Sequence, residues 1–271
     1  MSLKIIRGRS GSGKSTYILN DMPEDAPVIY IVPEQFSFTA EKMLINKFGM
    51  VGLGMPVVLS FMRLADTVFS TYGSPEFIAD NASFEMLVSY CANSVKPEKF
   101  HLFEGLVKKS ELAQTASNII TTFKRYRITP EKLTYAIERT NDEFLRKKLQ
   151  DALVIYEAYT KEIAEAGIAD QNDKLSVLAD ILSDDNCDFL TDKHIYIDQF
   201  SDFDPSEYEC IKQMIKKAKS VTIALCTDGN LLFETVNRTY NRLCVIAKEC
   251  NVKQLPAIEL SDAMLSSSPM L

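Results

Sequence analysis

The chain has 271 residues, 46% of them hydrophobic and 25% charged, with 30 Lys and Arg against 37 Asp and Glu and a net charge of −7. This composition is typical of folded globular proteins and excludes the collagen-like, disordered and disulfide-scaffold classes. Proteins that bind nucleic acids through bulk charge are basic, so we expect any DNA contact of this acidic chain to be local. It has no apolar run near the roughly 18 residues of a membrane span and no signal-peptide pattern at its start, which predicts a cytoplasmic protein without membrane contact.

The first 73 residues alternate between strand patterns and helix patterns. Short apolar or β-branched runs predict strands at residues 3–7, 28–32 and 57–59. Apolar residues at helical spacing predict helices at 37–48 and from Ser60, the expected N-cap, to about Gly73. Strands and helices that alternate in this way are typical of a parallel α/β sheet.

A long helical stretch follows, and then the strand patterns return. Residues 76–184 show helical periodicity with almost no strand signal. Strand patterns reappear at 194–198 and 221–225, with a helix pattern around 208–217 between them. The simplest arrangement is an α/β domain that is interrupted by an all-helical insertion.

This pattern predicts two domains and a terminal segment. We assign residues 1–73 and 185–271 to the α/β domain and residues 74–184 to the helical insertion. Residues 261–271 are small and polar, which predicts either a frayed tail or a linker at which a longer chain is cut.

Six cysteines are scattered along the chain without a CxxC pair. Only His101 and His194 are available to complete a set of metal ligands, and no spacing matches a zinc site. The pattern therefore favours reduced thiols that pack as small hydrophobic side chains.

Residues 8–15 read GRSGSGKS and match the phosphate-loop pattern GxxxxGK[ST] in full, between a predicted strand and a predicted helix. Glycines allow the loop to direct backbone N–H groups at phosphate oxygens, and the helix N-terminus favours an anion. Lys14 is expected to reach the β- and γ-phosphates, and Ser15 to offer its hydroxyl to Mg²⁺. We predict that ATP–Mg²⁺ binds to Gly8, Arg9, Ser10, Gly11, Ser12, Gly13, Lys14, Ser15 and Thr16.

The strand pattern at 194–198 ends in Asp198, which is predicted to be a second magnesium ligand. The run IDQFSDFDPSE that begins at Ile197 resembles the DExx box of helicases related to UvrD and Rep. Asp198, Phe200 and Asp202 match that box, whereas Gln199 stands where the helicases have a catalytic Glu and Ser201 where they have a Gln.

Further segments extend the resemblance along the whole chain. Asp170–Leu175 is similar to the acidic stretch that closes the helical insertion of those helicases. Together, GRSGSGKS, VPEQFSF, LSFMRLA, FKRYRITPEKL and YIDQFSDFDPSEY resemble the amino-terminal part of the AddB (RexB-like) component of bacterial AddAB-type ATP-dependent helicase–nucleases.

The resemblance implies a RecA-like P-loop fold, binding of ATP and Mg²⁺, and a role in double-strand-break resection and recombinational repair. It implies DNA as a partner, either single-stranded or at a break end, and a heterodimer with the helicase–nuclease A subunit. It also implies a carboxy-terminal nuclease domain with an iron–sulphur cluster, none of whose residues lie in this chain.

Gln199 predicts weak hydrolysis. The Glu of a working site positions and deprotonates the attacking water, whereas a Gln can position water but cannot accept a proton at neutral pH. Asp202 or Glu207 could supply the missing carboxylate. Asp228 resembles a remnant of the third helicase motif, but no γ-phosphate-sensing Gln follows it, and the chain is too short for a second RecA-like domain.

Residues 106–150 carry ten Lys and Arg and five Asp and Glu, which leaves a net charge of −12 on the rest of the chain. Within this segment, Lys124, Arg125 and Arg127 alternate with Phe123 and Tyr126, a pattern that suits stacking on bases and contact with phosphates. We predict single-stranded DNA contacts at the three cations. For the two aromatics, the three-residue spacing places both on one helix face and favours core packing over stacking on bases. A solvated face remains an alternative for the cations.

Two other classes of function remain open at this point. A P-loop kinase acting on a small molecule or nucleoside could use the helical insertion as a lid and would need no DNA. A structural scaffold could retain a relic phosphate loop, and titration with nucleotide would distinguish it from an ATP-binding protein.

Overall fold

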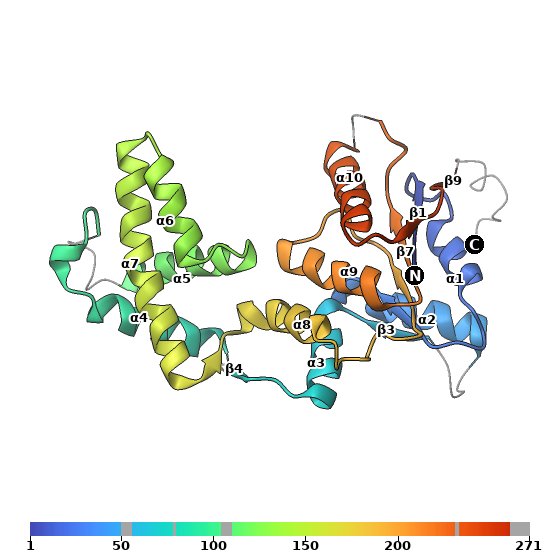
Figure 1. Cartoon of the computed structure of the whole chain (residues 1–271), viewed down its shortest axis with the longest axis horizontal. Coiled ribbons are helices and arrows are strands. Elements are labelled where there is room, and N and C mark those ends of the chain that lie inside the picture. The colour runs from blue at the N-terminus through green and yellow to red at the C-terminus, as the bar shows by residue number, and fades with distance from the viewer. Residues whose placement is uncertain (50–55, 78–79, 104–109, 231–232, 261–271) are drawn as a thin grey trace. The chain divides into compact units, whose positions relative to one another are not determined.

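The structure, a computed structural model, describes residues 1–49, 56–77, 80–103, 110–230 and 233–260. The chain forms two compact units (Figure 1). The sheet unit consists of Met1–Tyr72 and the residues from Leu178 on, and the helical unit of Gly73–Val177. Our domain limits at residues 74 and 184 stay a prediction, and the expected terminal segment at 261–271 lies outside the described residues.

The sheet unit is built on one parallel sheet. Its strands are β1 (Ser2–Gly8), β2 (Val28–Ile31), β3 (Val57–Leu59), β6 (His194–Ile197), β7 (Ser220–Leu225), β8 (Lys253–Gln254) and β9 (Ile258–Leu260). The order is β3-β2-β6-β7-β1-β8, β9 also pairs with β1, and each of these pairs is parallel. This is a RecA-like α/β sheet, so the predicted fold class is confirmed.

Helices flank this sheet (Figure 1). They are α1 (Lys14–Asp21), the short η1 (Glu34–Phe36), α2 (Ser37–Phe48), α3 (Phe61–Tyr72), α8 (Lys174–Ser183), α9 (Pro205–Lys217) and α10 (Glu234–Glu249). The predicted helices at 37–48, 60–73 and 208–217 are confirmed. Ser60 Oγ accepts the Arg63 backbone N–H at 3.3 Å, as expected of an N-cap.

The sheet is buried on both faces, which is why its strands read as continuous apolar runs. All four residues of β2 are buried. Because alternate strand residues point to opposite faces, Ile6, Tyr196 and Ala224 share one face and form a cluster with Ile18 of α1 and Leu44 of α2. This packing fixes the carboxyl edge of the sheet, where the loops after β1, β6 and β7 begin.

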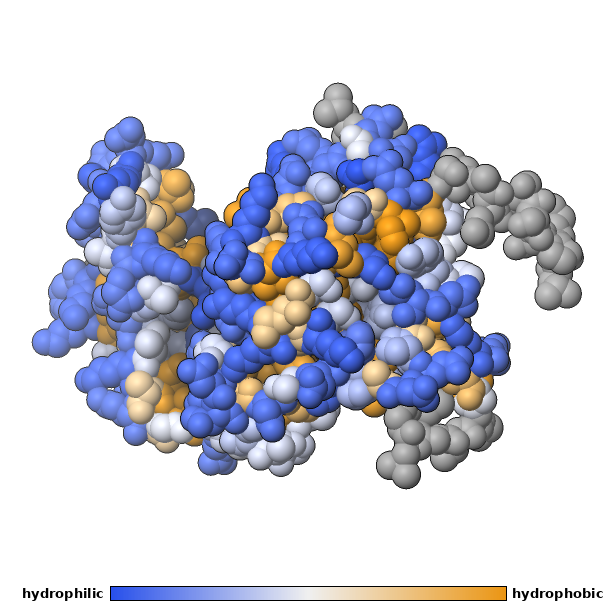
Figure 2. All heavy atoms as spheres, turned by 45° about the vertical axis from the view of Figure 1, so that its right-hand side comes forward, coloured by the Kyte–Doolittle hydropathy of each residue, from blue (hydrophilic) through white to orange (hydrophobic). Residues whose placement is uncertain are grey.

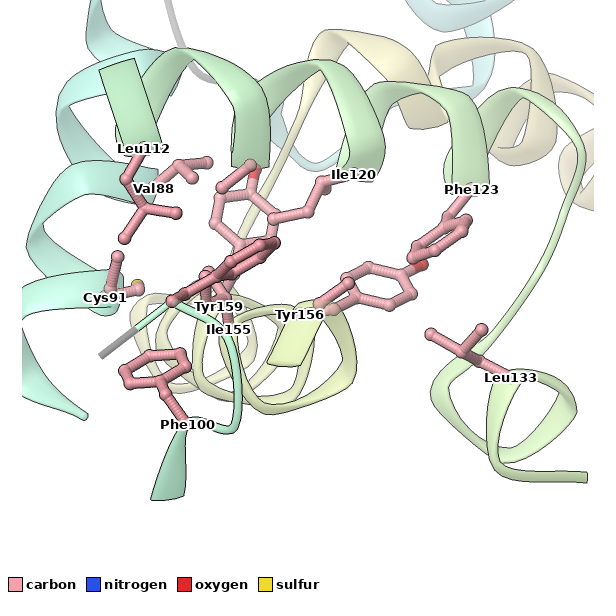
Figure 3. Close-up of a cluster of buried hydrophobic side chains, with 14 of the residues drawn as sticks. Val88, Cys91, Phe100, Leu112, Ile120, Phe123, Leu133, Ile155, Tyr156 and Tyr159 are labelled. Carbon is pink, nitrogen blue, oxygen red and sulfur yellow. The ribbon is translucent and has the colours of Figure 1, made fainter. Parts of the chain in front are cut away.

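Among its described residues, the helical unit has four long helices and two short ones. They are α4 (Asn81–Ser94), η2 (Pro97–Lys99), α5 (Ser110–Arg125), α6 (Pro130–Arg139), α7 (Glu143–Ala166) and η4 (Gln171–Asp173). Their apolar side chains form one core (Figure 3). Within it, the ring centroids of Phe123 and Tyr156 lie 5.7 Å apart and those of Phe84 and Tyr159 5.5 Å apart. The predicted helical insertion is confirmed.

Two details of the helical unit were not predicted. Strand β4 (Glu76–Phe77) pairs in parallel with β5 (Ile168–Ala169), and two residues are too few to show a strand period. The fully buried Asp151 carboxylate accepts the backbone N–H groups of His101 (2.7 Å), Leu102 (2.7 Å) and Phe103 (2.9 Å) and thereby holds a loop against α7.

The face drawn in Figure 2 is ordinary for a globular protein. The face in Figure 2 carries mainly hydrophilic side chains with separate smaller apolar patches between them. Within the described residues, no helix combines the length and the apolar character that crossing a bilayer requires. The six cysteines are free thiols, and Cys91, Cys187 and Cys210 are buried, in keeping with packing as small hydrophobic side chains.

Candidate functional site

A cavity of about 410 Å³ opens at the carboxyl edge of the sheet, beyond the ends of β1, β6 and β7. This edge is where open parallel sheets place their ligands. The lining residues are Ser10, Gly11, Gly13, Lys14, Ser15, Thr16, Asp198, Gln199, Phe200, Ser201, Ala224 and Cys226. The structure thus brings the predicted phosphate loop and Asp198 into one cavity, although 183 residues separate Ser15 from Asp198.

Three glycines shape the loop for different reasons. Gly11 and Gly13 have φ angles of 79° and 86°, in the left-handed region that side chains with a Cβ rarely adopt. At Gly8, a Cβ would meet the Ser12 hydroxyl and lie 2.9 Å from the Leu260 carbonyl oxygen. The loop can therefore turn tightly and present the N-terminus of α1 to the cavity.

The Lys14 ammonium is held at the base of the loop. Its Nζ donates to the carbonyl oxygens of Gly8 (2.9 Å) and Arg9 (2.7 Å), and the residue is only 9% exposed. An ammonium has three N–H donors, so these two bonds leave one for an anion in the cavity. Phosphate oxygens bound by the loop would meet a positive charge that is already positioned.

Ser15 and Asp198 form the second half of the site. Ser15 Oγ donates to Asp198 Oδ2 at 2.6 Å, and Tyr30 OH donates to the same oxygen at 3.0 Å. Asp198 is 1% exposed. Burial and the neighbouring carboxylate raise the pKa of Tyr30, which keeps this phenol protonated as a donor. Sequence reasoning missed Tyr30, because within a buried strand it reads as a core residue.

Gln199 follows Asp198 with a φ angle of 69°, which is uncommon for a residue with a side chain. Its backbone N–H donates to Asp198 Oδ1 at 2.8 Å. Its side-chain Nε2 donates to Ser15 Oγ at 3.0 Å and lies 3.5 Å from Asp198 Oδ2. The residue at the position of the helicase Glu therefore turns back onto both predicted magnesium ligands.

The two alternative carboxylates are used in local structure and do not line the cavity. Asp202 Oδ1 accepts the hydroxyl groups of Thr239 (2.9 Å) and Tyr208 (3.1 Å). Glu207 Oε2 accepts the Asp204 backbone N–H at 2.8 Å in the capping box of α9. Neither is placed to receive a proton from a water in the cavity.

Asp228 contacts the phosphate loop through Arg9. Its Oδ2 accepts Arg9 Nε at 2.8 Å, and its Oδ1 accepts the Asn230 backbone N–H at 2.9 Å. The backbone N–H of Asn230 and then Arg9 hold the pKa of Asp228 below its usual value. Its carboxylate is thus used to fix the loop.

These residues fit a nucleotide with magnesium. The glycine turns and the α1 N-terminus suit phosphate oxygens, Lys14 supplies a buried cation, and the Ser15 hydroxyl and Asp198 carboxylate are hard oxygen ligands of the kind that Mg²⁺ prefers. For the ion to reach those two oxygens, the Gln199 amide would have to give way.

The structure places the three predicted DNA-contacting cations in different environments. Lys124 is only 6% exposed; its Nζ lies 3.1 Å from Asp170 Oδ2 and also pairs with Asp173, and it faces the Tyr159 ring. Arg125 is exposed and Arg127 is half-buried. The charge of Lys124 is therefore compensated inside the helical unit, which weighs against a phosphate contact. Lys108 and Lys109 of the basic segment lie outside the described residues.

The end of α5 explains this difference. The Ile128 N–H donates to the Phe123 carbonyl (2.7 Å) and the Arg127 N–H to that of Lys124 (2.9 Å), with Arg127 at a φ of 52°. This is a Schellman motif, which ends the helix. Phe123 consequently stays in the core, whereas Tyr126, beyond the helix, is 55% exposed. Core packing is thus confirmed for Phe123 and wrong for Tyr126.

Comparisons with known proteins agree along the whole chain. The family model described as "ADDB, N-terminal" matches residues 5–271. The B subunit of the ATP-dependent helicase/deoxyribonuclease of Clostridium tetani is 36% identical, over 96% of this chain and 24% of its own length. The equivalent protein of Acetivibrio thermocellus is 33% identical, over 100% of this chain and 25% of its own length, and that of Clostridium botulinum (strain Loch Maree) 34%, over 93% and 23%. The chain spans about a quarter of these relatives.

Proposed function

Since the chain belongs to the AddB family and matches the amino-terminal region of its members, we propose that it is the ATP-binding, helicase-like part of an ATP-dependent helicase–nuclease. This enzyme would act in double-strand-break repair. The observation that carries the proposal is the convergence of Lys14, Ser15 and Asp198 on one cavity at the carboxyl edge of the sheet. Each of these residue types has a defined part in binding a nucleoside triphosphate.

Each residue has its own part in the proposed binding. Backbone N–H groups of the loop and the α1 N-terminus hold phosphate oxygens, and Lys14 neutralises charge on the β- and γ-phosphates. Ser15 and Asp198 are the oxygens open to a magnesium ion once the Gln199 amide gives way, and a bound ion would supply further neutralisation of the phosphates.

The partners are proposed from the family and from the surface of the helical unit. The relatives are named as one subunit of an ATP-dependent helicase/deoxyribonuclease, so we propose a second subunit and DNA as partners of this chain. The exposed Arg125 and the half-buried Arg127 are the proposed phosphate contacts, with Lys124 anchoring the end of α5 beside them. Nuclease activity and an iron–sulphur cluster are proposed only for the remainder of the full-length protein.

Calorimetric titration with ATP in magnesium tests the proposal. Heat of binding that saturates is expected, together with salt-dependent binding of single-stranded DNA. Absence of ATP binding at millimolar nucleotide would favour a scaffold with a relic loop. Rapid phosphate transfer from ATP to a small molecule without DNA would favour the kinase alternative.

Hydrolysis by this chain is expected to stay near background, with or without single-stranded DNA. Gln199 cannot accept a proton, and a general base contributes a factor of about 10²–10⁴. Gln199→Glu is expected to restore little, because none of the described residues that line the cavity is an arginine that could stabilise charge on the transferring phosphate. A phosphate-release assay checks this, and brisk turnover by the unmodified chain would show that the missing base is wrongly assigned.

DNA binding is expected to depend on the exposed end of α5. Combining Arg125→Ala with Arg127→Gly removes both cations, and glycine suits the left-handed position of residue 127. We expect weaker binding of single-stranded DNA without sequence preference. The slope of log affinity against log salt should become shallower by about 1.4, since each phosphate contact contributes about 0.7.

The matched control replaces two lysines of α9 in the sheet unit. Lys212 is half-buried and Lys216 is exposed, which reproduces the exposure of the arginine pair. Lys212→Ala with Lys216→Ala is expected to change DNA affinity and the salt slope much less. Equal losses in the two double variants would identify the basic segment as a solvated face.

A further inference from the structure

The Gln199 side chain bridges the two residues that are proposed as magnesium ligands. Its Nε2 donates to Ser15 Oγ at 3.0 Å and lies 3.5 Å from Asp198 Oδ2, while those two oxygens are 2.6 Å apart. The amide therefore faces the same pair of oxygens that the metal would use. An N–H donor and a metal ion compete for the lone pairs of such oxygens.

Protein donors crowd the Asp198 oxygen that faces Ser15. Oδ2 accepts from Ser15 Oγ and from Tyr30 OH at 3.0 Å and faces Gln199 Nε2, and Oδ1 accepts the Gln199 backbone N–H at 2.8 Å. An ionised carboxylate offers about four acceptor positions. Oδ2 has about two of these positions and faces three donors, one of which is the Gln199 side chain.

The backbone of Gln199 is bent to make these contacts. A φ of 69° turns the residue back toward Asp198, so that its main-chain and side-chain N–H groups both point at the carboxylate. Such conformations in residues other than glycine concentrate at functional sites. The next residue, Phe200, packs on Phe61 with ring centroids 5.6 Å apart, which anchors the turn.

We propose that the Gln199 amide takes the place of the magnesium ion between Ser15 and Asp198, so that the site binds ATP with little dependence on a divalent cation. This inference rests on the proposed function. The side chain of a Glu at this position has no N–H to donate and would be repelled by Asp198, which would leave Ser15 Oγ and Asp198 Oδ2 to the metal. A single amide in place of a carboxylate thus changes how the site responds to magnesium.

The test compares ATP affinity in excess MgCl₂ with ATP affinity in EDTA, measured by calorimetry on the 271-residue chain. For the unmodified chain, we expect the two affinities to differ by less than about threefold. In Gln199→Ala, the ratio of the affinity in magnesium to the affinity in EDTA should increase about fivefold. The metal then no longer has to displace the side-chain hydrogen bond from its ligands, and the net free energy of one hydrogen bond corresponds to about this factor. Gln199→Glu should increase the ratio at least as much.

Gln35→Ala is the matched control, because Gln35 is an exposed glutamine of the sheet unit that does not line the cavity. Its affinity ratio should equal that of the unmodified chain. If Gln199→Ala binds ATP with the same ratio as the unmodified chain, the inference is overturned while the proposed function stands. If no form binds ATP in either buffer, the proposed function itself fails.

Discussion

Replacing Lys124 with Met is expected to lower the free energy of unfolding of the helical unit by about 3–5 kcal/mol, the usual effect of removing one partner from a buried ion pair. Lys124 is 6% and Asp170 1% exposed, with 3.1 Å between Lys124 Nζ and Asp170 Oδ2. Asp170 also accepts the Tyr159 hydroxyl at 2.8 Å, so the network links α5, α7 and η4. Urea denaturation followed by circular dichroism measures the loss.

The loss of stability in Lys124→Met should be smaller at low pH. Burial raises the pKa of Asp173 and Lys124 opposes this shift, so the variant should raise that pKa further. A carboxyl whose pKa is higher in the folded state binds its proton more tightly there, and lowering the pH therefore favours folding. The deficit of Lys124→Met should be smaller at pH 5 than at pH 7.

Two further variants isolate the buried charge. Lys161→Ala removes an exposed lysine of α7 and should cost less than about 0.5 kcal/mol. Adding Asp170→Asn to Lys124→Met removes both charges of the pair and should recover a substantial part of the stability. If Lys124→Met unfolds at the same urea concentration as Lys161→Ala, the buried pair does not stabilise the unit.

Replacing Lys14 with Ala is expected to abolish ATP binding in the calorimetric titration. Lys14 is the cation that the structure holds at the base of the loop, through the carbonyl oxygens of Gly8 and Arg9. Hydrogen bonds between a charged donor and phosphate oxygens are roughly twice as strong as neutral ones. The methyl group of alanine cannot form them. The loss should exceed that of any other single substitution at the cavity.

The matched control is Lys42→Ala, which removes an exposed lysine of α2 away from the cavity. Its ATP affinity should stay within about twofold of the unmodified chain, because salt and water screen an exposed charge that does not line the cavity. Comparable affinities for Lys14→Ala and Lys42→Ala would place the nucleotide somewhere other than the loop of residues 8–16.

Several elements followed from the sequence because their causes are local. Helix α2 has the predicted bounds 37–48, since apolar spacing and a terminal glycine define it within one segment. The glycines at 8, 11 and 13 each meet a backbone requirement of the loop itself. The parallel α/β class followed from the alternation of strand and helix patterns.

Other features depend on which distant segments pack together, and no local pattern contains them. Strand β7 lies between β1 and β6, which adds Ala224 and Cys226 to the cavity wall. Tyr30 has the pattern of a core residue, yet its hydroxyl reaches Asp198 because β2 pairs with β6.

Lys124 has the sequence pattern of a surface cation, yet it is buried, because η4 brings Asp170 and Asp173 to its ammonium from nearly 50 residues further along the chain. The sequence alone thus determined the local elements and the residue types of the site. Burial and pairing across long separations decided which charges face solvent, and these belong to the tertiary structure.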